Sequence, residues 1–288
     1  MLFKDEHSAS KFLQNVSYYR IKGCWWDMQS DTVKHQFKSD IFFEDVVDIY
    51  NFDRELKLIL FDALERIEIA LRTKMIYHLS ISYGGLWYLD TTLFENTVTT
   101  LNNVTKTIHL HTIDELKKEF KRSKEIFVID HRNRLGNEEA DAWKIFEVAS
   151  MGTLSKLFKV IKHQLPEKSM ISKEMGLNLH SELSSWLESI TYIRNIIAHH
   201  SRLWSRNMVK KPVLDLKNPI GQWIINPLTP VQSKKPFLII STMVYLCNQL
   251  YPTCDLRNNI LTLFDRSPNI PIYKLGFLNN WIQEPIWY

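Results

Sequence analysis

Residues 52–81 repeat apolar side chains with the period of an α-helix, and this run constrains the fold more than any other feature of the chain. One face of the run stays apolar for about five turns, which predicts a long helix with a continuous buried stripe. The stripe consists of Leu56, Ile59, Leu60, Ala63, Leu64, Ile67, Leu71 and Met75. Asn51 is a candidate N-cap for this helix, and residues 42–49 predict a separate short helix before it.

A second amphipathic helix, over residues 182–200, ends where polar residues replace its apolar stripe, and residues 193–204 read IRNIIAHHSRLW. At 100° per residue, Asn195 and His199 lie within about 40° of each other, whereas Arg194 and His199 lie about 140° apart. Arg194 therefore reaches His199 only around the helix edge, unless a second copy of the helix brings its own Arg194 or His199 into the same cleft. The dipole at this end of the helix favours a protonated imidazole.

Three segments of the chain carry a resemblance to a known family. In order, they are YNFDRELKLILFDALERIEIALRT, WKIFEVASMGTLSKLF and RNIIAHHSRLW. They resemble the most characteristic segments of the abortive-infection family of bacterial phage-defence proteins, of the AbiD and AbiF type. The spacing of Arg194 and His199 also resembles the R-x4-6-H signature of the HEPN superfamily of helical ribonucleases and RNA-binding proteins. The resemblance covers residues 18–204, roughly two thirds of the chain.

The resemblance implies an all-α fold, a HEPN-like helical bundle with extra N-terminal and C-terminal helical segments. We expect a two-helix core of residues 52–81 and 182–200, braced by an amphipathic helix or helix pair over residues 142–163. Beyond Trp204 the composition changes, because residues 209–236 hold five prolines, which predicts extended packing rather than a flexible linker. We therefore expect residues 1–208 to form the core and residues 209–288 a helical extension packed on it, in one compact unit.

An arginine and a histidine supply two parts of RNA cleavage without a metal ion. An imidazole can take or give the proton of a reacting oxygen, and a guanidinium can hold the non-bridging phosphate oxygens. We expect Arg194, Asn195 and His199 to be catalytic, with Asn195 fixing the imidazole tautomer or a phosphate oxygen. The other interpretation is a helix end whose carbonyls are satisfied by these side chains. The candidate supporting residues are His200, Arg72, Glu68, Glu147 and Arg202.

Two of these supporting roles have simple alternatives. Glu68 and Arg72 are spaced for an ion pair on a solvated helix face, and the alternative is that they line the cleft beside Arg194. Glu147 lies on the apolar side of its predicted helix and needs a partner if it is buried, for which Arg72 and Arg194 are the candidates.

Basic side chains are densest over residues 117–134, where they outnumber acidic ones. This stretch is either a solvated face or a phosphate-binding surface, and a net charge of +4 permits nucleic-acid binding without requiring it. Its basic residues are Lys117, Lys118, Lys121, Arg122, Lys124, Arg132 and Arg134.

The remaining features set the expected environment. Three cysteines without metal spacing indicate a reducing compartment, and no apolar run is long enough to cross a bilayer. The first ten residues do not form a signal peptide, so we expect a cytoplasmic protein without membrane contact. No carboxylate and histidine cluster has ligand spacing, so we expect neither a metal nor another cofactor.

Three functions from different classes remain open at this stage. The first is a toxin-like endoribonuclease in phage defence, which attacks through the ribose 2'-OH at a site completed by a homodimer or higher homo-oligomer. The second is a non-catalytic HEPN module that binds RNA, including a small noncoding regulatory RNA, or a partner protein. The third is a protein-interaction switch that senses a phage component.

Overall fold

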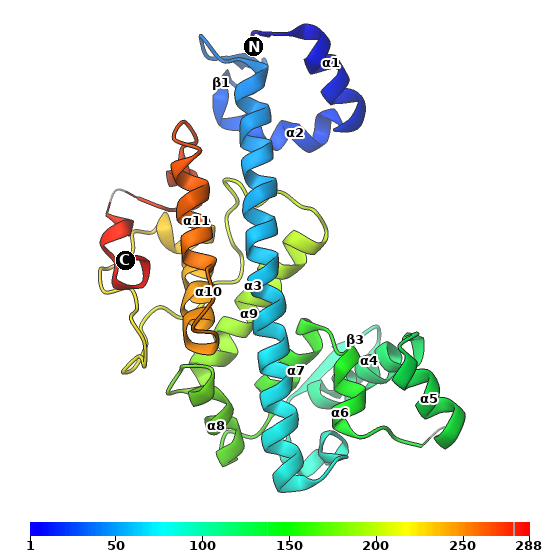
Figure 1. Cartoon of the computed structure of the whole chain (residues 1–288). Coiled ribbons are helices and arrows are strands. Elements are labelled where there is room, and N and C mark those ends of the chain that lie inside the picture. The colour runs from blue at the N-terminus through cyan, green and yellow to red at the C-terminus, as the bar shows by residue number, and fades with distance from the viewer. Residues whose placement is uncertain (137, 279) are drawn as a thin grey trace.

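The computed structural model describes residues 1–136, 138–278 and 280–288 and is mostly helical (Figure 1). Helices hold 62% of the residues and strands 6%, so the predicted all-α class is confirmed. The helices are α1 (Glu6–Asn15), α2 (Tyr18–Trp25), α3 (Phe43–Tyr83), α4 (Ile108–Arg122), α5 (Ile126–Leu135), α6 (Ala142–Ile145), α7 (Met151–Val160), α8 (Pro166–Glu174), α9 (His180–Ala198), α10 (Pro236–Leu250) and α11 (Leu256–Asp265). The strands form two antiparallel hairpins, β1 (Gln29–Asp31) with β2 (Gln36–Phe37) and β3 (Val98–Leu101) with β4 (Val104–Thr107).

Helix α3 is one continuous helix of 41 residues, about 60 Å long, and most other helices pack along it, namely α2, α6, α7, α8, α9, α10 and α11 (Figure 1). The predicted break at Asn51 is therefore wrong. Asn51 is exposed within the helix, where its weak helix propensity costs less than about 1 kcal/mol. Ile49, Phe52 and Leu56 on either side are buried, so the apolar stripe crosses the expected cap and packing holds the helix together.

The core lies where α3 and α9 meet α7, α8 and α10. Helix α10 is buried over almost its whole length, because its sequence is apolar on every side. The residues before it cover the core in extended form, held by indole donors. Trp186 Nε1 donates to the Val213 carbonyl at 2.9 Å, and Trp223 Nε1 donates to the Leu214 carbonyl at 2.9 Å. Whether residues 1–208 form a core of their own stays a prediction.

Helix α2 runs through Gly23, although a glycine inside a helix is unfavourable by about 1 kcal/mol relative to alanine. The glycine has a packing reason. A Cβ atom placed there would lie 2.6 Å from Nε of Arg202, so only glycine lets that side chain cross α2. The position thus joins the N-terminal helices to the segment that follows α9.

The middle of the chain is divided into short elements. The basic stretch of residues 117–134 is shared between α4 and α5, which separate at Ser123, and residues 142–163, expected as a helix or helix pair, hold α6, a short 3-10 turn and α7. The hairpin of β3 and β4 precedes α4, which begins at Ile108. Of the helices in the described ranges, none has the length and apolar character needed to span a membrane.

Candidate functional site

Helix α9 ends at Ala198 in a tight turn that carries both histidines. The Ser201 amide donates to the Ile196 carbonyl at 2.9 Å, and the His200 amide donates to the Ile197 carbonyl at 2.9 Å, which together make a Schellman cap. His200 has a φ of +54°, in the left-handed region where glycine is usual. Backbone strain of this kind persists only where the surrounding contacts fix it.

The four polar side chains of the motif are partly or fully open to solvent. Asn195, His199 and His200 are exposed, and Arg194 is half-buried. In the part of the chain that the structure describes, no hydrogen bond or ion pair involves any of these four side chains. The structure brings them to one end of one helix but does not join Arg194 to His199.

Arg72, by contrast, has acceptors from two segments at its two Nη atoms, while its buried Nε has no partner among the described residues. The Nη2 of Arg72 lies 3.0 Å from Glu68 Oε1 and 3.0 Å from the Ala149 carbonyl oxygen. Its Nη1 lies 3.5 Å from Glu147 Oε2. The Glu68 and Arg72 side chains are 18% and 12% exposed, so this contact is mostly buried. The expected pairing of Glu147 with an arginine is present, although Glu147 is 49% exposed rather than buried.

Arg194 is close enough to Glu68 for its charge to act on that carboxyl. Burial raises the pKa of the Glu68 carboxyl, and the positive charges of Arg72 and Arg194 oppose that shift. Glu119 of α4 adds a negative charge that raises the pKa further. Glu68 thus forms an ion pair with Arg72 and interacts through charge with Arg194, so it connects the Arg72 cluster (Glu68, Arg72 and Glu147) to the motif helix.

The segment after α9 is anchored to α3 by residues that sequence reasoning missed. Asp53 Oδ1 accepts from the backbone amides of Leu203 at 3.0 Å and Trp204 at 2.6 Å, and Asp53 also pairs with Lys57 at 2.9 Å. The sequence feature that could have pointed to Asp53 is a carboxylate among the apolar residues of one helix. Arg202, predicted as catalytic support, donates to the carbonyl of Trp204 and so braces its own turn.

Helix α9 and the turn after it lie within a match to a known protein family. The family described as Abi-like protein matches residues 11–205, more than half of the chain. The chain belongs to the Abi-like protein family. The match runs from α1 to the turn after α9 and ends before α10. Neither the curated proteins nor the solved structures contain a match to the chain.

Family membership supports a role of this Abi-like protein in phage defence by abortive infection. The matched range includes the motif, the Arg72 cluster and Asp53, so the residues gathered around the end of α9 all lie in the part shared with the family. The C-terminal helices α10 and α11 lie outside that range.

The basic stretch of this Abi-like protein divides into held and free side chains. Lys117 pairs with Glu139, Arg134 pairs with Asp130 at 2.7 Å, and Arg132 donates to two backbone carbonyls at the junction of α4 and α5. These three therefore serve the local fold. The others are exposed and form no ion pair with any described residue: Lys118, Lys121, Arg122 and Lys124.

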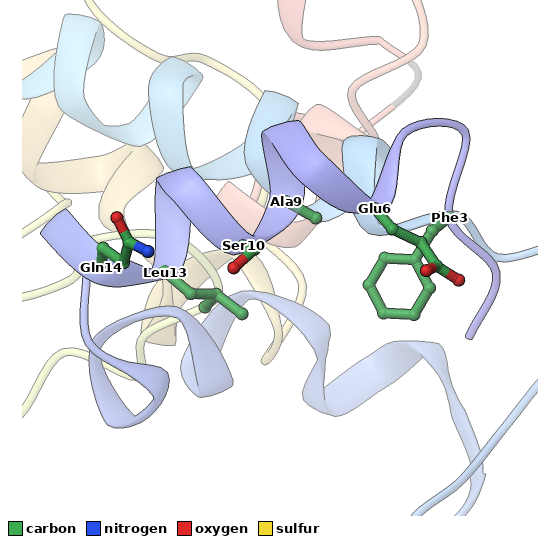
Figure 2. A pocket seen from close by; sticks show the side chains of 6 residues that line it. All are labelled: Phe3, Glu6, Ala9, Ser10, Leu13 and Gln14. Atoms are coloured by element: carbon green, nitrogen blue, oxygen red, sulfur yellow. The ribbon is translucent and has the colours of Figure 1, made fainter.

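Two hollows lie at the N-terminal end of the protein, and they differ in charge. The first is an apolar hollow on α1, shown in Figure 2, where Phe3, Ala9 and Leu13 provide most of the lining and Glu6 is its one charged group. The second opens between α2, α3 and the end of α9, and His200 is among its lining residues. Among residues 1–136, 138–278 and 280–288 no group of three or more His, Cys, Asp or Glu side chains is arranged to hold a metal ion.

Proposed function

We propose that this Abi-like protein is a metal-independent endoribonuclease of the HEPN type. The observation that carries the proposal is the state of the motif side chains. Arg194, Asn195 and His199 stand at the end of α9 without partners among the described residues, so a substrate can reach them without breaking an intramolecular hydrogen bond. Groups left free beside an ordered, strained turn are available to a substrate.

The reaction needs a base, an acid and a holder for the phosphate. One imidazole takes the proton of the ribose 2'-OH, the 2' oxygen attacks phosphorus, and the bond from phosphorus to the 5' oxygen breaks as that oxygen receives a proton. The products are a 2',3'-cyclic phosphate and a free 5'-OH. Arg194 holds the non-bridging oxygens as negative charge develops, and Asn195 orients the imidazole or a phosphate oxygen.

A second copy of the chain gives this chemistry its second proton-transfer group. One His199 cannot take and give a proton at opposite sides of phosphorus in the same step. A homodimer that faces two α9 ends across one cleft supplies two imidazoles and two guanidinium groups. It also removes the difficulty that Arg194 and His199 lie on different faces of a single helix.

The test is cleavage of a labelled single-stranded RNA and its all-deoxy counterpart in EDTA. We expect cleavage of RNA alone, to cyclic-phosphate ends, with losses of about 10²-fold to 10⁴-fold in His199→Ala. His7→Ala removes an exposed histidine of α1 and serves as the matched control. Equal cleavage by His199→Ala and the control would exclude His199 from catalysis.

A second candidate function is RNA binding without cleavage, by a HEPN-like module that holds a small noncoding RNA. The observation that favours it is the exposed, unpaired set of Lys118, Lys121, Arg122 and Lys124 on α4 and after it. His199→Ala separates the two functions. If the protein binds RNA without cleaving it, wild type shows no cleavage, and wild type and His199→Ala bind RNA with the same affinity.

A further inference from the structure

The hollow that His200 lines is a groove of about 780 Å³ between the start of α2, the N-terminal half of α3 and the end of α9. We call it the basic groove and define it by Arg20, Arg54, Lys57, Leu58, Phe61 and His200. Neither Arg20 nor Arg54 stands out in the sequence, because they lie on two helices that only the fold brings together. The groove opens directly beside the turn that carries His199.

The groove carries an excess of positive charge. Its lining contains no aspartate or glutamate, and although Lys57 is neutralised by Asp53 at 2.9 Å, the two arginines are not. Arg54 is exposed and has no ion pair or hydrogen bond within the described chain. Arg20 donates one Nη1 hydrogen to the His200 carbonyl and pairs with no carboxylate among the described residues, so most of its five donors stay free.

Apolar surface lies between these cations. Phe61 and Leu58 of α3 are 45% and 59% exposed, and both line the groove. An aromatic ring beside two unpaired guanidinium groups matches a nucleotide, since a base stacks on the ring and its phosphate meets the fork of an arginine. A protein partner would need carboxylates placed at the same two arginines and is less well matched to an open aromatic ring.

We propose that the basic groove binds the RNA strand next to the cleaved bond, with a phosphate held by Arg20 and Arg54 and a base stacked on Phe61. The identity of the bound strand as RNA rests on the proposed function. Arg20 has a further effect, because its hydrogen bond to the His200 carbonyl ties the strand-binding guanidinium to the turn that holds His199. Strand binding and the position of the imidazole are therefore coupled through one side chain.

The test measures binding rather than cleavage, in a His199→Ala background, with a short labelled single-stranded RNA at several salt concentrations. We expect Arg54→Ala to weaken binding about tenfold and to lower the slope of log affinity against log salt by about 0.7. Arg20→Ala has the same two effects. Phe61→Ala weakens binding about fivefold or more and leaves the salt slope unchanged, because stacking releases no counterions.

Lys173→Ala is the matched control, since Lys173 is an exposed cation on α8, outside the groove, with no ion pair among the described residues. Arg54 makes no contact that the fold needs, so its variant stays informative even if Arg20→Ala is poorly folded. Affinities of Arg54→Ala and Lys173→Ala that agree at every salt concentration overturn the proposal. A loss of self-association in Arg54→Ala, with unchanged RNA affinity, overturns it too and assigns the groove to a second copy of the chain.

These outcomes separate the groove from the catalytic proposal. If wild type cleaves RNA while Arg54→Ala binds it as the control does, the groove proposal fails and the ribonuclease stands. If wild type is inert while Arg54→Ala and Phe61→Ala lose affinity as expected, the groove stands and the ribonuclease fails.

Discussion

Two arginines, Arg72 of α3 and Arg194 of α9, approach the same carboxylate and have opposite surroundings. Arg72 is 12% exposed and contacts two glutamates and a backbone carbonyl, whereas Arg194 has no hydrogen bond or ion pair among the described residues. A buried charge costs several kcal/mol unless it is paired, so Arg72 is bound to the fold. A half-buried charge bears a smaller cost and can be left for a ligand. Buried ion pairs with carboxylates therefore mark the structural arginine, and lack of any ion pair marks the functional one.

The largest expected effect is on catalysis. We expect Arg194→Ala to lower RNA cleavage by about 10²-fold to 10³-fold, because a preorganised donor to the developing charge is lost. The free energy of unfolding of this variant should change by less than about 1 kcal/mol, since no hydrogen bond or ion pair among the described residues is removed. Parallel cleavage assays and urea denaturation check both values. A large loss of stability in Arg194→Ala would contradict the conclusion that Arg72, and not Arg194, stabilises the fold.

The second effect is on stability. Arg72→Ala leaves Glu68 mostly buried without its close partner, and we expect the free energy of unfolding to fall by about 2 kcal/mol, less than for a fully buried pair. Urea denaturation measures the change, and cleavage by the folded fraction should fall far less than in Arg194→Ala. Arg66→Ala, at the exposed pair with Asp62 on the same helix, is the control and should cost under about 1 kcal/mol. Similar losses in the two variants would contradict the structural role of Arg72.

A smaller effect is expected at the turn after α9. His200→Gly relieves the left-handed conformation, and after the entropy cost of glycine we expect a gain of about 0.5 kcal/mol in stability. Thermal unfolding of this variant and of His200→Ala, which keeps the strain, isolates the backbone contribution. Cleavage retained in both variants would identify His200 as a helix end, and cleavage lost in both would make its imidazole a second proton-transfer group.

The smallest expected effect is on the pH dependence of stability. Burial raises the pKa of Glu68 in the folded protein, so between the unfolded and folded pKa values the folded state binds more protons. The stability that Glu68 contributes is then present below the unfolded pKa and lost as pH rises through the folded pKa. We expect wild type to gain stability relative to Glu68→Gln on acidification through that window, as measured by urea denaturation. Glu6→Gln, which removes an exposed carboxylate of α1 that has no ion pair among the described residues, is the control.

Local sequence signals predicted the helices better than their ends. Periodicity located α3 and α9, because burial of an apolar stripe is imposed at every turn. Asn51 was interpreted as a boundary and lies inside α3, and Gly23, a residue that disfavours helix, lies inside α2. A cap residue or a glycine changes helix stability by about 1 kcal/mol, which the packing of a long apolar face exceeds.

The sequence by itself determined the all-α class, the position of Arg194, Asn195 and His199 at the end of one helix, and the spacing that pairs Glu68 with Arg72. Each of these depends on residues within a few turns of one another. Only the tertiary structure decided that Arg194 is unpaired, that Asp53 anchors the turn after α9, and that Arg20 and Arg54 share a groove with His200. Such contacts join residues far apart in the chain, and no local pattern encodes a pairing that arises when separate helices pack.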